Sequence, residues 1–215
     1  MKIVGFITSV LFSVLAFGQE SYYFSNPVPS EQDVVLSVEK RLFGTYSSEV
    51  ATRVYEVNQN GVTILTTSIS SISRETIRES SKYDVRNNML YGLIEKDSVP
   101  CVLEGENYYF GVQNRDVIIG KNSLNKLTRL SSNEYIINYE EDGLFVPAKL
   151  IFSGNSLTIK EMEYEYGTKL FKKIKIQKEI PNEYFKLIVL SPTTEEFEKL
   201  IKKGAFIGDQ IFNKN

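Results

Sequence analysis

The chain has 215 residues, with 25 Lys and Arg against 27 Asp and Glu, one cysteine and no histidine. Without an imidazole, the ordinary serine and cysteine hydrolases are excluded, and so are most zinc sites. The formal net charge of −2 lacks the basic excess that binds phosphate backbones, so we expect no nucleic-acid partner. The chemistry left to the chain is that of carboxylates, lysines and tyrosines, or none.

The first 18 residues have the pattern of an export signal peptide. Lys2 precedes a largely apolar run from Ile3 to Leu15, and Ala16-Phe17-Gly18 places small residues where a signal peptidase reads them. We therefore expect cleavage before Gln19 and a secreted, envelope or bacterial periplasmic protein. The alternative is a retained anchor, but the run is shorter than the ~20 apolar residues that span a bilayer. No later run approaches that length, so we expect no transmembrane segment in the mature chain.

Residues 19–43 read as an entry segment to the main domain. Tyr22-Tyr23-Phe24 and Asn26-Pro27-Val28-Pro29 favour an extended or turn-rich path. Between residues 30 and 42, two structures fit the pattern: a short N-terminal helix capped by Ser30, or a strand. The periodicity leaves both open.

From residue 44 to residue 215 the sequence predicts a single domain that is mainly β. Runs rich in Val, Ile, Thr, Tyr and Phe alternate with turn residues, and no long helical pattern interrupts them. We expect an antiparallel β meander of about ten strands, rolled or barrel-like. Five dipeptides predict tight turns: Asn60-Gly61, Asn87-Asn88, Gly105-Glu106, Asp142-Gly143 and Gly154-Asn155. At Asn60-Gly61 we expect a type I′ turn, with positive φ at both residues.

Two residues in this region restrict the fold. Cys101 lies in the apolar segment Pro100-Cys101-Val102-Leu103, where a lone cysteine is usually a small buried hydrophobe. As the only cysteine, it cannot form an internal disulfide. Pro147 has no N–H to donate, so we expect a sheet edge or a bulge within the strand at 144–152.

The residues after 156 predict a hairpin with one charged face. Alternation places glutamates on one face of 157–166, and lysines on one face of 173–176, so that Glu163 would oppose Lys173. The lysines of this region are Lys169, Lys172, Lys173, Lys175 and Lys178. Acidic neighbours would cancel much of their field, so we expect no polyanion site among them.

A short C-terminal helix is predicted near the end of the chain. Thr193 and Glu196 have the spacing of a capping box, and Gly204 is placed to end the helix. The apolar content of residues 206–212 predicts a tail that packs against the sheet.

Two acidic clusters are candidates for catalysis. Glu140-Glu141-Asp142 and Glu195-Glu196 could supply the carboxylate pair of a glycoside hydrolase. The first falls at a predicted turn and the second in the first turn of the predicted helix, where carboxylates have local roles. Carboxylate-dependent glycoside hydrolysis is therefore kept only as an alternative, and we predict no catalytic, cofactor-binding or metal-binding residue.

The segment Leu42-Phe43-Gly44-Thr45-Tyr46 is similar to the Gly-x-Trp entry of lipocalin-like barrels, with Tyr46 in place of the tryptophan. The resemblance covers only this segment. It implies a cup-shaped barrel that binds an apolar small molecule.

Together these observations predict a non-catalytic exported binding protein that holds an apolar small molecule or lipid inside a curved sheet. The alternative is a structural or interaction protein that docks another envelope protein through a sheet face or edge. An empty apolar interior would favour the first function, and a filled core with an exposed apolar patch would favour the second.

Overall fold

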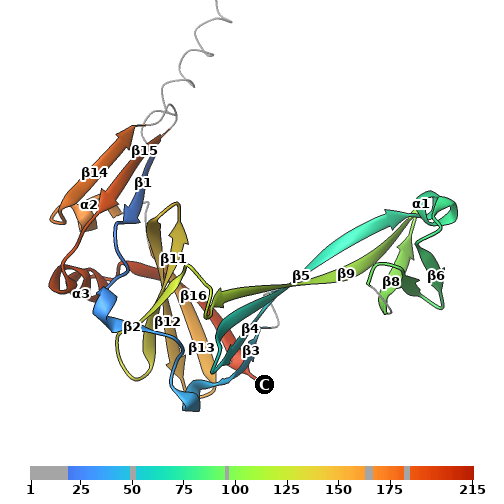
Figure 1. Ribbon diagram of the computed structural model, residues 1–215, viewed down its shortest axis with the longest axis horizontal. Helices are drawn as coiled ribbons and strands as arrows, with labels where there is room; N and C mark the ends of the chain where they lie inside the picture. Colours follow the sequence, from blue (N-terminus) through green and yellow to red (C-terminus); the bar gives the residue numbers. More distant parts are fainter. Residues whose placement is uncertain (1–18, 49–51, 95–96, 163–166, 182–184) are drawn as a thin grey trace, which may run out of the picture.

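The computed structural model describes residues 19–48, 52–94, 97–162, 167–181 and 185–215; the expected signal peptide at 1–18 lies outside them. The protein is mainly β, as predicted, and its large, mostly antiparallel sheet is rolled but not closed. Figure 1 shows three parts: a body of curved strands, a small layer beside it, and a long two-stranded arm.

The body contains most of the sheet. Its strands are β2 (Val34–Val35), β3 (Gly44–Ser47), β4 (Arg53–Asn58), the first part of β5 (Gly61–Ser73), the last part of β9 (Asn107–Ile119), β10 (Lys126–Arg129), β11 (Glu134–Glu141), β12 (Leu144–Ser153), β13 (Ser156–Met162) and β16 (Phe206–Lys214). Neighbouring strands follow the order β11-β12-β13-β16-β3-β4-β5-β9, and β10 and β2 extend the sheet beyond β11. Strands as short as β2 and β3 are not separate runs in the sequence, so the sheet has more strands than we expected.

The inner face of the rolled sheet holds the main core. Alternate residues of each strand point to this face, and at one end of the roll they are large aromatics. The rings of Tyr46 and Tyr135 pack edge-on against Phe152, with centroid distances of 5.7 and 6.0 Å. Val38 and Leu42, from the segment before β3, pack against the same cluster. This end of the roll is therefore filled with side chains.

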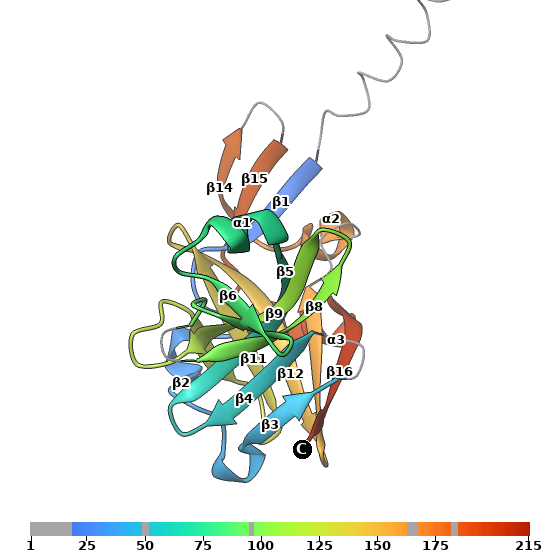
Figure 2. The same ribbon diagram turned by 90° about the vertical axis from the view of Figure 1, so that its right-hand side faces the viewer.

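A second layer lies beside the body (Figures 1 and 2). It consists of β1 (Gln19–Phe24), β14 (Ile176–Pro181), β15 (Phe185–Leu190), α2 (Gly167–Phe171) and α3 (Thr194–Lys202). β1 pairs in parallel with β15 and joins the body by pairing with β12. The ring of Phe24 packs edge-on against Phe171 of α2 and Phe197 of α3, with centroid distances of 6.3 and 6.0 Å.

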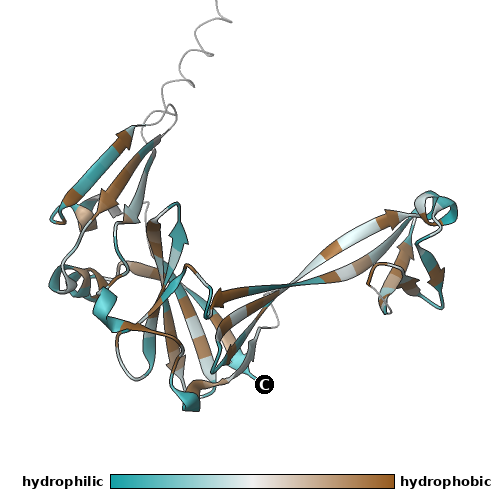
Figure 3. Cartoon of the chain, viewed as in Figure 1, coloured by the Kyte–Doolittle hydropathy of each residue, from teal (hydrophilic) through white to brown (hydrophobic). Residues whose placement is uncertain are grey.

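The arm is formed by the last part of β5 and the first part of β9, which are paired antiparallel; each whole strand has thirteen residues and is therefore about 40 Å long. At its tip lie α1 (Arg74–Glu79), β6 (Asp84–Arg86), β7 (Met89–Tyr91) and β8 (Ser98–Glu104). Leu90, Val99, Cys101 and Phe110 form a small core there, which confirms that Cys101 is buried. Figure 3 shows hydrophobic residues in the body and again at the tip.

The short N-terminal helix that the pattern allowed does not form. Glu31–Asp33 and Lys40–Leu42 are single 3₁₀ turns, with the two-residue strand β2 after the first. Val38 and Leu42 are buried, whereas Val34 is 37 % exposed. These three residues, four apart in sequence, therefore do not form one face of a helix. The chain is extended instead, which brings Val38 and Leu42 to the filled end of the body.

Four of the five predicted turns are confirmed as tight hairpins. Asn87 and Asn88 have φ of 50° and 59°, and Asp142 and Gly143 have φ of 52° and 80°. These are the positive angles that a type I′ turn requires. The turns at Gly105-Glu106 and Gly154-Asn155 also join directly paired strands.

The prediction of a type I′ turn at Asn60-Gly61 was wrong, although β4 and β5 do form a hairpin there. Asn58 pairs with Gly61, so the loop consists of Gln59 and Asn60. Of the two residues predicted to have positive φ, only Gly61 does, with φ of 125°. A Cβ at Gly61 would lie 1.9 Å from the carbonyl oxygen of Ile119. Glycine is needed there because the end of β9 crosses against it.

The predicted hairpin between 157–166 and 173–176 was also wrong. β13 pairs with β12 on one side and with β16 on the other, and Glu163 lies outside the described residues. Pairing with β16 sets Leu157 against Phe212 and Met162 against Phe206, all buried. Ile176 lies instead in β14, where it pairs with Leu190 of β15 and is 47 % exposed.

Pro147 lies within the sheet and pairs with Asn138 of β11. On the other side of β12, pairing with β13 begins at Ala148, and pairing with β1 occurs at Phe145. The sheet is thus locally open on one side of Pro147, which suits a residue without a donor.

The C-terminal helix α3 is confirmed. Thr193 accepts a hydrogen bond from the Glu196 N–H, and the Glu196 carboxylate accepts one from the Thr193 N–H, which completes the capping box. Gly204 follows the helix with φ of 77°. The tail packs as expected, as the strand β16 inside the sheet.

Candidate ligand cavity

A cavity of about 430 Å³ opens at the end of the roll opposite the aromatic cluster. Strands β4, β5, β9, β11, β12, β13 and β16 all contribute to it. Its apolar wall is formed by Ile64, Val146, Pro147, Ala148, Ile159 and Met162. The interior of the roll is therefore filled at one end and hollow at the other.

Two tyrosines separate the filled end from the hollow end. Tyr55 of β4 and Tyr139 of β11 both line the cavity. Tyr55 is buried, with its ring 4.8 Å from that of Phe212, and Tyr139 packs against the same core cluster. The cavity thus has an aromatic floor that belongs to the main core.

The tyrosine hydroxyls differ in their partners. In the filled end, the Tyr46 hydroxyl donates to the Leu42 carbonyl at 2.7 Å, and the Tyr135 hydroxyl accepts from the Glu39 N–H at 3.1 Å. At the cavity, Arg53 lies close enough to the Tyr55 hydroxyl to lower its pKa. The Tyr139 hydroxyl has no hydrogen-bond partner among the residues that the structure describes, so it is available to a molecule in the cavity.

Charged side chains surround the mouth of the cavity. Arg53 on β4, Asp116 on β9 and Glu161 on β13 line it, and all three are exposed. Burial raises the pKa of Tyr55, while Arg53 lowers it and Glu161 raises it further. Burial also raises the pKa of Tyr139, with smaller effects from Tyr55, Arg53 and Glu161. Both tyrosines are therefore neutral phenols at neutral pH, and the mouth carries two carboxylates and one guanidinium.

Asn125, just before β10, connects the end of β9 with β11. Its Nδ2 donates to the Ile118 carbonyl at the end of β9, at 2.9 Å, and its Oδ1 accepts from the Glu140 N–H of β11 at 2.8 Å. A side chain here replaces the ladder hydrogen bonds that would close a barrel. The cavity is thereby held between strands that are not paired to each other.

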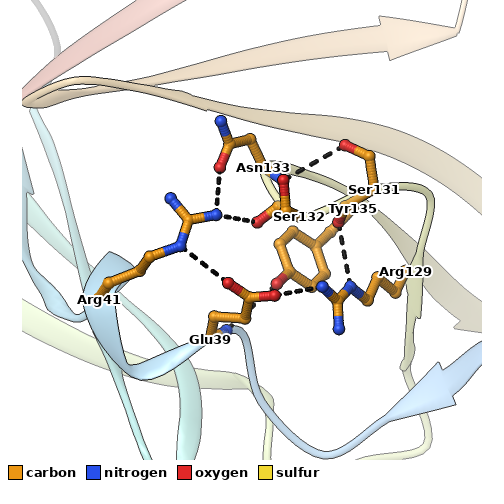
Figure 4. A network of polar contacts seen from close by, with 7 residues as sticks. All are labelled: Glu39, Arg41, Arg129, Ser131, Ser132, Asn133 and Tyr135. Atoms are coloured by element: carbon orange, nitrogen blue, oxygen red, sulfur yellow. Dashed lines mark hydrogen bonds and ion pairs between the residues drawn. The ribbon is translucent and has the colours of Figure 1, made fainter.

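A polar network closes the opposite end of the roll (Figure 4). The Glu39 carboxylate is paired with Arg41 and Arg129, and Arg41 also donates to the Ser132 carbonyl at 2.8 Å. The neighbouring hydrogen bond from Arg129 goes to the Ser131 carbonyl at 3.2 Å. Every charge in the network has a partner, so we interpret it as a clamp that fixes the entry segment to the β10–β11 hairpin.

The acidic clusters proposed from the sequence have local partners. Glu140 accepts from the Gly143 N–H within its turn, and Glu141 accepts from the Tyr23 hydroxyl at 2.9 Å. Glu195 pairs with Lys199 at 2.8 Å, and Glu196 completes the capping box. None of these carboxylates lines the cavity.

The other residues singled out in the sequence lie away from the cavity. The lysines from 169 to 178 are exposed on α2 and β14 and in the residues between them. Cys101 is in the tip of the arm, where burial raises the pKa of its thiol. Tyr46, the residue of the lipocalin-like segment, is in the filled end of the body.

A second candidate surface lies on the arm. Val102 and Tyr109 are register partners on β8 and β9, and Ile69 of β5 lies on the same outer face, opposite Gly111. Ile69 is 79 % exposed and Val102 is 69 % exposed. The residues of β5 from Gly61 to Ser73 include no charge and no proline, the usual protection of a sheet edge.

Comparison with known proteins does not indicate what these sites bind. Within the described residues, no helix is long and apolar enough to cross a membrane, and no three acidic or thiol side chains gather as a metal-binding group. No protein-family model, curated protein or solved structure matches the chain.

Proposed function

We propose that the protein is a non-catalytic, exported binding protein that holds a small molecule with an apolar body in the cavity of its rolled sheet. The observation that carries the proposal is the Tyr139 hydroxyl, which lines the cavity without a hydrogen-bond partner in the described structure. The protein does not enclose this hydroxyl, so it can hydrogen-bond to water or to a ligand in the cavity. Export rests on the pattern of residues 1–18.

The size and the chemistry of the cavity restrict the ligand. A volume of about 430 Å³ lies in the range of sites for small organic molecules. The aliphatic wall favours an apolar body. A purely apolar ligand, however, would leave Tyr139 unpaired at the floor and would desolvate the charges at the mouth. We therefore propose that the ligand is amphipathic, which is more specific than the apolar small molecule or lipid expected from the sequence.

Binding of Nile red, a neutral dye whose emission rises in apolar surroundings, tests this function. Ala148 is a small residue of the cavity wall, so Ala148→Phe fills the cavity. We expect saturable emission with the unmodified protein and a large loss with Ala148→Phe. Ile69→Ser removes an exposed side chain of the arm and should leave the signal unchanged. A signal lost in Ile69→Ser but retained in Ala148→Phe would contradict the proposal.

The exposed face of the arm favours docking to another envelope protein as a second candidate function. Ile69, Val102 and Tyr109 are exposed on one face of strands β5, β8 and β9. Contiguous exposed apolar surface commonly marks a contact with another molecule. Co-purification of a single protein that is lost in Ile69→Ser, together with no ligand in the cavity, would favour this function.

A further inference from the structure

We infer that the polar end of the ligand is a cationic ammonium group, held at the mouth of the cavity between Asp116 and Glu161. This inference rests on the proposed function, because it assigns the class of molecule that the same cavity binds. It is carried by the placement of two carboxylates around a cavity whose floor presents an unpartnered phenol.

The two carboxylates face the cavity from different parts of the sheet. Asp116 lies on β9 and Glu161 on β13, with β16, β3, β4 and β5 between these strands in the sheet order. Asp116 pairs in register with Ile64, which also lines the cavity, and Glu161 pairs with Ala148 of its wall. A group at the mouth would therefore have a carboxylate on two sides.

Three other carboxylates of the body are in ion pairs, whereas these two are not. Glu56 pairs with Arg115 at 2.7 Å, Glu134 with Lys149 at 3.1 Å, and Asp209 with Lys160 at 2.8 Å. In the part of the chain that the structure covers, neither Asp116 nor Glu161 has a cation within ion-pair distance. The body thus uses its lysines and arginines elsewhere and leaves negative charge at the cavity.

Arg53 only partly offsets this charge. Its guanidinium lies near the Tyr55 hydroxyl, and it is the one cation among the described residues that line the cavity. Two carboxylates and one guanidinium leave one excess negative charge at the mouth. A monocation would neutralise it, whereas a carboxylate ligand would add a third anion at short range.

An ammonium group matches the remaining hydrogen-bonding capacity. It has three N–H donors and no acceptor, and it would face two carboxylates and the oxygen of Tyr139. The electron-rich faces of Tyr55 and Tyr139 also attract cations. The apolar body of the same molecule would then lie against Ile64 and Ile159.

Three probes with the same octyl chain and different head groups test the inference: octylammonium, octanol and octanoate. Each is titrated against the protein with bound Nile red, and displacement of the dye is measured. We expect octylammonium to bind at least about tenfold more tightly than octanoate, with octanol between them. Added salt should reduce the difference, because the mouth is exposed to solvent.

Variants identify the carboxylates responsible. Asp116→Asn and Glu161→Gln should each lower the ratio of octylammonium affinity to octanol affinity. Asp209→Asn is the control, because it removes a nearby carboxylate that already pairs with Lys160 on the outer side of β13. This control should keep the full preference.

The outcomes separate the two proposals. Tighter binding of octanoate or octanol than of octylammonium, or dye that no octylammonium displaces, would overturn the inference and leave the proposed cavity function standing. Failure of Nile red itself to bind in the cavity would overturn both.

Discussion

Tyr46 and Tyr139 both belong to the core of the rolled sheet, but only Tyr46 has a hydrogen-bond partner within the described structure, the Leu42 carbonyl at 2.7 Å. Tyr46 is 1 % exposed in the filled end of the roll. Tyr139 lines the hollow end. One tyrosine, Tyr46, therefore stabilises the fold at the filled end, and the other, Tyr139, is available to a ligand at the hollow end.

Removing these two hydroxyls should have different effects on stability. Tyr46→Phe removes a buried hydrogen bond and leaves the Leu42 carbonyl unpaired, so we expect it to cost about 0.5–1.5 kcal/mol. Tyr139→Phe removes a hydroxyl without a partner and should change the free energy of unfolding by less than about 0.5 kcal/mol. Urea unfolding of the ligand-free variants measures both. Equal losses would show that Tyr139 is already satisfied in the free protein.

Asn138 is the polar centre of the core. Its Oδ1 accepts from the Val28 N–H at 2.9 Å and its Nδ2 donates to the Val28 carbonyl at 3.0 Å, with no exposed surface. Asn138→Leu leaves the Val28 N–H buried and unpaired, whereas the Val28 carbonyl keeps the hydrogen bond from Thr128, so we expect a loss of roughly 1–3 kcal/mol in unfolding free energy. Asn213→Leu, at an exposed position of β16, should cost less than about 0.5 kcal/mol. Similar values for the two would contradict the role of Asn138.

The clamp around Glu39 predicts a pH dependence. The hydrogen bond from Arg41, together with the charge of Arg129, holds the pKa of Glu39 below its ordinary value of 4.5. Its stabilising effect is therefore complete above that value and is lost as the pH falls through the lower pKa of the folded protein. Glu39→Gln should be less stable than the unmodified protein at pH 7, and the difference should shrink below pH 4.5.

Glu106→Gln is the control for this series, because Glu106 lies in the β8–β9 turn away from the clamp. Denaturant unfolding at several pH values should show a nearly constant difference for it. A Glu39→Gln difference that is equally constant would show that the clamp does not contribute through its charge.

Gly61 and Gly105 both have positive φ but differ in their surroundings. A Cβ at Gly61 would lie 1.9 Å from the Ile119 carbonyl oxygen, whereas a Cβ at Gly105 would meet nothing within 4 Å. Gly105→Ala should lower the free energy of unfolding by only about 1 kcal/mol, the cost of placing a residue with a Cβ in a left-handed conformation. Gly61→Ala should cost clearly more, because β9 must also shift. Thermal unfolding of the pair measures the difference, and equal shifts would exclude the close approach.

The sequence predicted the features that depend on near neighbours. The capping box of Thr193 and Glu196 spans three residues, and the positive φ angles of Asn87 and Asn88 follow from side chains that tolerate them. The alternation of β13 was also visible. Its partner was not, because Phe206–Lys214 lies more than forty residues later and the nearer lysine-rich run offered a plausible match.

The cavity could not be predicted for the same reason. Tyr55 and Tyr139 are ordinary strand aromatics in the sequence, and Asp116 and Glu161 are ordinary strand carboxylates. They share a cavity only because the sheet rolls and brings β4 and β9 round to face β11 and β13. The one local signal was Arg53-Val54-Tyr55, in which alternation places a charge on the same face as a core aromatic.

Native mass spectrometry of the protein purified from its own envelope tests the central claim most directly. We predict one small molecule bound per chain, present in the unmodified protein and in Ile69→Ser, and absent from Ala148→Phe. A chain that carries no small molecule, or a molecule that Ala148→Phe retains and Ile69→Ser loses, would contradict it.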